Sequence, residues 1–149
     1  MGTIEFEFSR WEQGELSGFD LGDMTVTGSF GVHSSSGQRP DQSMMIYLGI
    51  AHLVSGVCDL AQGRQKSFEF VGTDSSYSLS FKRRRKEVVV SSGRTLLGEV
   101  TMSELLHALS RGVREFLDIP GNQLPPSEAA DEDLRASLRA LGHVLQQYG

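Results

Sequence analysis

The sequence predicts an α+β domain in which an antiparallel sheet of about five to six strands carries a long central helix and two C-terminal helices. Three observations predict this class. Apolar and polar residues alternate near the N-terminus, the apolar period lengthens to that of a helix at residues 40–63, and further strands precede the last two helices. Successive strands set apart from helices favour an antiparallel sheet and the order ββαββββαα. The 149 residues fit a single domain over residues 1–149.

The N-terminal strands are predicted by strict alternation. Residues 3–11 place Ile4, Phe6 and Phe8 on one face and acidic or hydroxyl side chains on the other, as in a half-buried strand. Alternation returns in residues 23–33, with His33 expected on the polar face. The apolar face of this second segment is expected to hold Met24, Val26, Phe30 and Val32.

The longest helix is predicted over residues 40–63. Pro40 and Asp41 suit a helix start, and Gly63 suits a helix end. A wide apolar face predicts that this helix lies across a sheet. Its core stripe consists of Ile46, Ile50, Leu53, Val57 and Leu60. The opposite side, expected to face solvent, consists of Gly49, His52, Ser55, Gly56 and Asp59.

Four short strands are predicted next, and then two helices. The second helix opens with Thr101 and Glu104 at the spacing of a capping box, in which each residue satisfies a backbone amide of the other. The last helix is acidic in its first turns and basic later, which suits the helix dipole. The strands are expected at residues 66–72, 76–83, 87–92 and 94–100, and the last helix at residues 128–147.

Composition narrows the class of protein. The net charge is −5, and the single cysteine, Cys58, lies in an apolar helical run, which predicts a buried thiol. The N-terminus starts acidic and alternating, unlike a signal peptide. The uncharged run at residues 42–58 is too short and too polar for a membrane span. We therefore expect a cytoplasmic protein without a membrane partner.

Five consecutive basic residues occupy positions 82–86, in the stretch SFKRRRKEV. One alternating run ends before them and another begins after them, so they are expected at a hairpin tip, where charges are well solvated. Two functional interpretations remain: Arg83, Arg84 and Arg85 contact an acidic protein, or the run binds nucleic acid or a phosphate ligand. The remaining nine of the 14 basic residues are scattered among 19 acids, which disfavours nucleic acid.

A small enzyme of unknown chemistry is a third interpretation, because His52, Ser55 and Asp59 share one side of the central helix. His52 and Asp59 are two turns apart, about 10 Å along the helix axis. Side chains standing parallel on one helix do not converge into a chain of nucleophile, base and orienting group. The histidines also lack partners at a metal-ligand spacing. The sequence therefore predicts no catalytic site, no metal and no cofactor.

Three apolar side chains are candidates for contact with a partner: Trp11, Met45 and Leu48. Trp11 falls by parity on the polar face of the first strand, where it is either covered by another element or offered to a partner. Met45 and Leu48, near the start of the central helix, either form a contact patch or touch the serine-rich loop or a terminal helix.

The layout of the chain resembles that of small single-domain immunity proteins of bacterial polymorphic toxin systems. The resemblance is carried by alternating strands, then RPDQSMMIYLGIAHLVSGVCDL, then FEFVGTDSSYSLSF and further strands, over roughly residues 3–110. It implies an α+β domain that binds and blocks one cognate toxin, and it assigns no role to individual residues. We therefore expect a non-enzymatic protein-binding domain, and an immunity-type inhibitor is the form that the resemblance implies.

Overall fold

The computed structural model describes residues 2–11, 15–38, 41–73 and 75–148. These residues form eight strands and three helices, and the predicted α+β class with antiparallel pairing is confirmed. The strands are β1 (Ile4–Arg10), β2 (Leu21–Gly28), β3 (Gly31–Ser34), β4 (Met44–Met45), β5 (Ser67–Val71), β6 (Ser78–Arg84), β7 (Glu87–Ser92) and β8 (Thr95–Thr101). The helices are α1 (Ile46–Ala61), α2 (Met102–Asp118) and α3 (Ala129–Tyr148).

The prediction of one sheet with five to six strands is wrong, because the strands form two four-stranded sheets. The N-terminal sheet has the order β1-β2-β3, with β4 also paired to β2, and the C-terminal sheet has the order β5-β6-β7-β8. The sheets meet where the turn between β2 and β3 contacts β8, and there the Phe30 amide donates to the Leu97 carbonyl at 2.9 Å. Among the described residues the strands of the two sheets are not paired with each other, and this contact is made by the turn.

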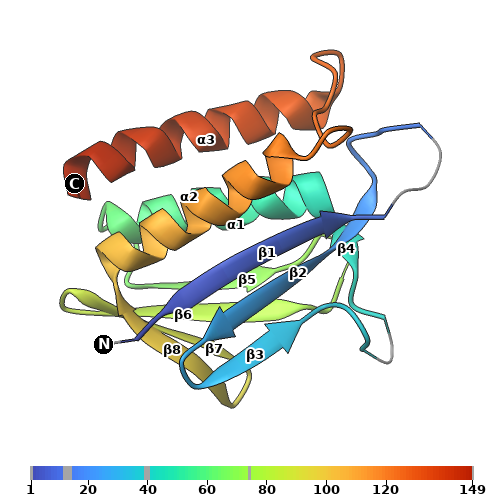
Figure 1. Cartoon of the computed structure of the whole chain (residues 1–149). Helices are drawn as coiled ribbons and strands as arrows, with labels where there is room; N and C mark the ends of the chain where they lie inside the picture. The colour runs from blue at the N-terminus through green and yellow to red at the C-terminus, as the bar shows by residue number, and fades with distance from the viewer. Residues whose placement is uncertain (1, 12–14, 39–40, 74, 149) are drawn as a thin grey trace.

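The three helices lie on one side of the two sheets (Figure 1). α3 forms the outer layer over α1 and α2, and α2 runs along β1. The core between helices and sheets is closed by fully buried large side chains such as Tyr47, Phe70, Tyr77 and Phe81. Each buried side chain of this size contributes about 1.5–3 kcal/mol. No helix of the described residues covers the opposite faces of the two sheets.

The expected apolar face of residues 23–33 is half wrong. Met24 and Val26 are fully buried, but Phe30 and Val32 are 62% and 60% exposed. A tight turn at residues 29–30 reverses the chain, and Val26 then pairs with His33. After the turn the odd-numbered residues therefore share the side of Val26, and Val32 lies on the other side. His33 therefore faces inward, where its ring stacks on Tyr77 with centroids 4.6 Å apart. Burial lowers the pKa of His33.

The central helix begins later than predicted. Asp41 lies before the helix and Pro40 lies outside the described residues, while Met44 and Met45 pair with β2 as the short strand β4. The predicted end is confirmed, since α1 stops at Ala61 and Gly63 adopts a positive φ of 79°. The five predicted core-stripe residues of α1 are all fully buried.

Two glycines of α1 are not on the solvent side where they were expected. Gly56 lies so close to the Phe68 ring that a Cβ would overlap it. A Cβ at Gly49 would lie 2.9 Å from the Met44 sulfur. The two glycines lie on the side of α1 that turns toward β5. His52 and Ser55 lie beside that side of the helix and are exposed, as predicted.

Candidate functional site

The open side of the N-terminal sheet is the first candidate surface. Cross-strand pairing places alternate residues of β1, β2, β3 and β4 on this side, and none of them is buried. We call it the N-terminal face. It consists of Glu5, Glu7, Ser9, Trp11, Leu21, Asp23, Thr25, Thr27, Val32, Ser34 and Met45.

Trp11 and Met45, two of the predicted contact residues, come together at one end of the N-terminal face. The Trp11 amide donates to the Leu21 carbonyl at 2.9 Å, and Leu21 is the register partner of Met45. All three side chains are half-buried. The result is an apolar row across the end of the sheet, accessible from outside.

The Trp11 indole is held in one orientation by polar partners. Its Nε1 donates to Asp23 Oδ2 at 2.8 Å, and the Ser35 hydroxyl donates to Asp23 Oδ1 at 2.7 Å. The Met24 amide donates to the buried Ser35 hydroxyl, which fixes that side chain in turn. A tryptophan that is already oriented loses little side-chain entropy when a partner binds.

The rest of the N-terminal face is acidic. Glu5 and Glu7 are exposed on β1, opposite Thr27 and Thr25, and the residues of the face include no Lys or Arg. The face therefore combines an apolar end with carboxylates and hydroxyls along its length, a mixture typical of the apolar centre and polar rim of protein interfaces.

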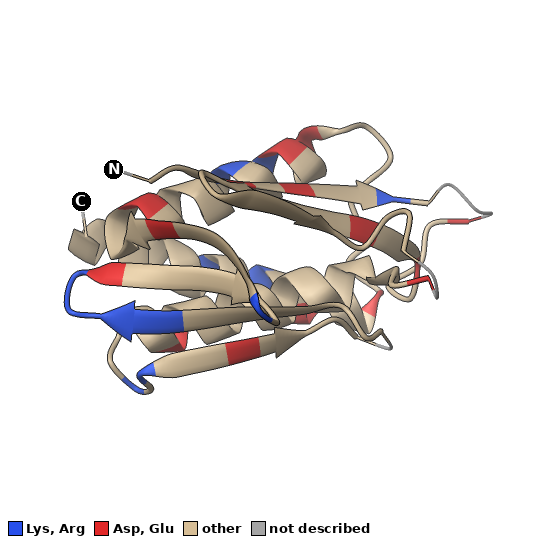
Figure 2. Ribbon diagram, turned by 90° about the horizontal axis from the view of Figure 1, so that it is seen from below, with Lys and Arg blue, Asp and Glu red and all other residues tan. Residues whose placement is uncertain are grey.

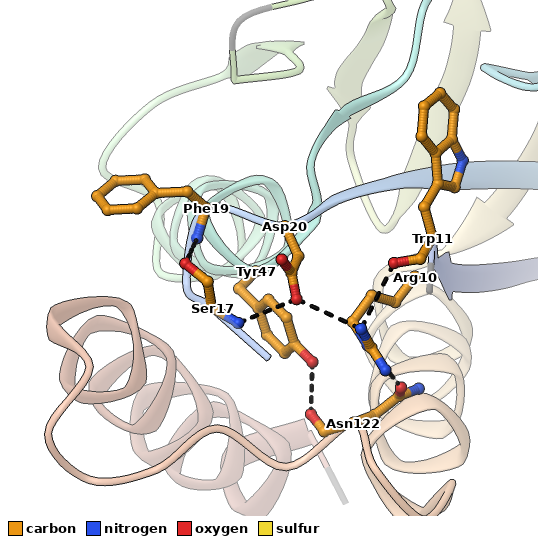
Figure 3. Close-up of polar contacts among 7 residues, drawn as sticks. All are labelled: Arg10, Trp11, Ser17, Phe19, Asp20, Tyr47 and Asn122. Atoms are coloured by element: carbon orange, nitrogen blue, oxygen red, sulfur yellow. Dashed lines mark hydrogen bonds and ion pairs between the residues drawn. The ribbon is translucent and has the colours of Figure 1, made fainter. Parts of the chain in front are cut away.

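A buried polar network lies beneath the apolar end (Figure 3). Arg10 continues the inward row of Ile4, Phe6 and Phe8, and its guanidinium lies 3.4 Å from Asp20 and 3.2 Å from Asn122 Oδ1. The side chains of Arg10 and Asp20 are each only 11% exposed. Sequence reasoning missed this network, although the parity of Arg10 in the first strand was the signal for it.

Tyr47 of α1 joins the same network. Its hydroxyl donates to the Asn122 carbonyl at 2.6 Å, and burial, with a further contribution from the Asp20 carboxylate, raises the pKa of Tyr47 to about 12. The Ile46 amide donates to the Asp20 carbonyl. The network thus joins the end of β1, the start of α1 and the loop after α2. It also contacts Trp11, since Arg10 Nη1 donates to the Trp11 carbonyl at 3.4 Å.

The network also holds an exposed aromatic side chain. Asp20 accepts a hydrogen bond from the Ser17 amide, and the Phe19 amide donates to the Ser17 hydroxyl. Phe19 is 67% exposed and points away from the network (Figure 3). Gly18 beside it packs against Ala130 of α3. This turn therefore presents Phe19 to solvent near the start of α3.

Leu48, the third predicted apolar contact, lies in the first turn of α1. It is half-buried and packs against the hydrophobic core, as in the alternative in which it touches neighbouring elements. The structure therefore pairs Trp11 with Met45 and leaves Leu48 mainly to packing.

The basic run lies at the tip of the β6–β7 hairpin, as predicted, but its members differ. Arg83 Nη1 donates to the carbonyls of Leu60 and Ala61 at the end of α1, and its Nη2 lies 3.2 Å from the Tyr148 hydroxyl. Arg84 and Arg85 are exposed, and Arg85 adopts a positive φ of 57° in the turn. Arg83 thus caps a helix, which leaves Arg84 and Arg85 as the arginines open to a partner.

The residues considered for catalysis are not assembled into a site. His52 lies against the rings of Phe68 and Phe70, with centroids 5.7 and 5.6 Å away. Asp59 pairs with Arg64 at 3.0 Å. Within the described ranges, no group of three or more His, Cys, Asp or Glu side chains is arranged to hold a metal ion.

Cys58 is buried, and this burial, together with the charge of Asp59, raises the pKa of the Cys58 thiol to about 11. A thiol of this kind remains protonated at neutral pH and is a poor nucleophile.

None of the helices in the described part of the chain is both long and apolar enough to cross a membrane. No protein family, no curated protein and no solved structure matches the chain.

Proposed function

We propose that the protein is a non-enzymatic, cytoplasmic protein-binding domain that docks one cognate protein on its N-terminal face. The observation that carries the proposal is the apolar row of Trp11, Leu21 and Met45 on an uncovered sheet, with Trp11 oriented in advance by Asp23. Oriented aromatic side chains are typical of the few residues that supply most of the binding energy of an interface.

The resemblance in layout to immunity proteins extends this proposal to a toxin domain as the cognate partner. An inhibitor needs a rigid surface because it must bind without a large ordering cost. The buried Arg10–Asp20–Asn122 network supports the proposal, because Arg10 also donates to the Trp11 carbonyl and so holds the backbone at the anchor residue.

Affinity capture from source lysate tests the proposal. The tagged full chain should retain one stoichiometric protein after nuclease treatment and high-salt washing. The Arg84→Glu/Arg85→Glu variant should retain the same protein, since the hairpin tip lies outside the N-terminal face. If neither the wild-type chain nor the Arg84→Glu/Arg85→Glu variant retains a partner, the proposal is contradicted.

Binding of nucleic acid through the hairpin tip is the second candidate, favoured by the exposure of Lys82, Arg84, Arg85 and Lys86. Two observations weigh against it: Arg83 is bonded internally, and Glu87 follows the run directly. If this candidate is right, the captured material is lost with nuclease or moderate salt, and the Arg84→Glu/Arg85→Glu variant captures nothing.

A further inference from the structure

The open side of the C-terminal sheet is a second uncovered surface, separate from the N-terminal face. Pairing of β5, β6, β7 and β8 places alternate residues on this side, and we call it the C-terminal face. It consists of Ser67, Glu69, Val71, Ser78, Ser80, Lys82, Arg84, Glu87, Val89, Ser91, Leu96, Glu99 and Thr101.

Charges on the C-terminal face are separated by strand near the hairpin tip. Lys82 and Arg84 lie on β6, whereas Glu87 lies on β7 and Glu99 on β8. Figure 2 shows this division: blue covers the end of one strand and the following turn, and the next strand begins in red. The boundary between the two signs runs between β6 and β7, parallel to the strands.

None of these four charged side chains forms an ion pair within the described residues. The ion pairs among the described residues are Arg10–Asp20, Arg64–Asp59 and Arg135–Asp131. Although Arg84 and Glu87 are register partners, Glu87 turns its carboxyl toward Glu99. The cations on one side and the carboxylates on the other are therefore available to a partner.

Glu87 and Glu99 form the acidic half of the C-terminal face, and their mutual repulsion is unfavourable when both carboxyl groups are ionised. A hydrogen bond to Glu99, together with the negative charge of Glu99, raises the pKa of Glu87. A carboxyl group whose pKa is raised by folding contributes stability at low pH, and this contribution is lost as the pH rises through the raised value. At neutral pH the two carboxylates repel each other, and a cation placed beside them would relieve that repulsion.

A hollow of about 460 Å³ opens beside these carboxylates. Glu87, Glu99 and Glu104 line it together with Phe30 from the turn between β2 and β3. The remaining lining residues are Gly2, Ser29, Val100 and Thr101. A hollow of this size and charge can hold the end of a Lys or Arg side chain.

A two-fold axis parallel to the strands, between β6 and β7, would make this face complementary to itself. Rotation by 180° about that axis leaves the position of each residue along the strand direction unchanged and exchanges the β6 side of the face with the β7 side. The basic half of one copy, with Lys82 and Arg84, therefore faces the acidic half of the other, with Glu87 and Glu99. Packed sheets lie about 10 Å apart, a gap that opposed Lys or Arg and Glu side chains can bridge. Small residues such as Ser78 and Ser91, and apolar ones such as Val71, Val89 and Leu96, occupy the remainder of the face.

We propose that a second copy of this chain binds the C-terminal face, with Lys82 and Arg84 of each copy lying against Glu87 and Glu99 of the other. Closed two-fold dimers are the commonest homo-oligomers, and their interfaces are complementary to themselves in this way. This dimer leaves the N-terminal face free, so it does not depend on the proposed function.

Sedimentation velocity of the full chain, over a series of protein and salt concentrations, tests the dimer. We expect a dimer at low salt that dissociates as salt screens the charges. The variants Lys82→Glu/Arg84→Glu and Glu87→Lys/Glu99→Lys should each dimerise at least about tenfold more weakly, because the four charged positions near the hairpin tip then all carry the same sign in both copies. An equimolar mixture of the two should form a heterodimer, since four negative side chains near the hairpin tip of one variant then meet four positive ones of the other.

The control is Glu5→Lys/Glu7→Lys, which makes the same change of charge on the N-terminal face. It should dimerise like the wild type while losing the cognate protein, so the two proposals fail separately. A wild-type chain that stays monomeric at every concentration and salt overturns the dimer, and this measurement needs no variant to fold. A mixture that forms no heterodimer, from variants with native circular dichroism, overturns it as well.

Discussion

Arg83 and Arg84 are neighbours in the basic run, but of their two side chains only that of Arg83 forms hydrogen bonds within the described residues. It donates to two carbonyls at the end of α1 and meets the Tyr148 hydroxyl, which itself donates to the Ala61 carbonyl at 2.6 Å. The charge of Arg83 is also favourable at the negative end of a helix dipole. Sequence reasoning grouped the two arginines together because a run of like residues does not reveal which member turns inward.

We predict that Arg83→Ala lowers the free energy of unfolding by about 2 kcal/mol, since hydrogen bonds from a charged donor contribute about 1.5–3 kcal/mol. Arg84→Ala is the matched control and should stay within about 0.5 kcal/mol of the wild type, because Arg84 is exposed. Urea unfolding followed by circular dichroism measures both. Equal effects of the two substitutions would show that Arg83 does not cap α1.

Two helical glycines make a second comparison at this scale. Gly56 in α1 leaves no room for a Cβ beside the Phe68 ring, whereas Gly142 in α3 has no atom within 4 Å of a Cβ position. Gly56→Ala should therefore destabilise the protein by about 1–3 kcal/mol through overpacking. Gly142→Ala should stabilise it by about 1 kcal/mol through helix propensity. Thermal unfolding distinguishes the two by sign, and a stabilised Gly56→Ala variant would contradict the packing of α1 on β5.

At the scale of elements, the sequence predicts those features that depend on residues close together in the chain, such as helix caps and hairpin strands. The capping box of α2 is present, with the Glu104 amide donating to the Thr101 hydroxyl at 3.1 Å and the Glu104 carboxylate accepting from Thr101. The ranges predicted for the hairpin strands, 76–83 and 87–92, agree with β6 and β7 to within two residues, since alternation and turn residues mark such boundaries.

Thr101→Ala should cost about 1 kcal/mol, the usual loss when an N-cap side chain is removed. Ser103→Ala, two residues further into the same helix, is the control and should change the free energy of unfolding by less than about 0.5 kcal/mol. Chemical denaturation of both variants tests the cap. A Thr101→Ala variant as stable as the wild type would show that the cap contributes nothing to stability.

Elements that depend on distant pairing could not be predicted. Met44 and Met45 are good helix formers, and they become strand β4 only because β2 offers them backbone partners. The sequence predicts one strand where the structure has β2 and β3, because Phe30 and Val32 keep the alternation across the turn at residues 29–30. Their exposure follows from the direction of the chain after that turn, and periodicity carries no information about that direction.

At the scale of the whole molecule, the division into two sheets decides which surfaces are free. The sequence predicts which side chains share a face, but one sheet and two sheets have the same alternation. With all helices on one side, the structure leaves both the N-terminal face and the C-terminal face uncovered (Figures 1 and 2). Of the predicted contact residues, Trp11 and Met45 lie on one face, whereas Arg84 lies on the other.

The central claim is that the cognate protein binds the N-terminal face, with Trp11 as an anchor. The most direct test is the dissociation constant of the complex with the captured protein, measured by titration calorimetry for the wild type, Trp11→Ala and Arg84→Glu/Arg85→Glu. We predict that Trp11→Ala weakens binding about 30-fold or more, as removal of an interface anchor usually does. The arginine variant should bind like the wild type. Unchanged binding by a natively folded Trp11→Ala variant, with loss of binding by the arginine variant, would contradict the claim and assign the partner to the hairpin tip.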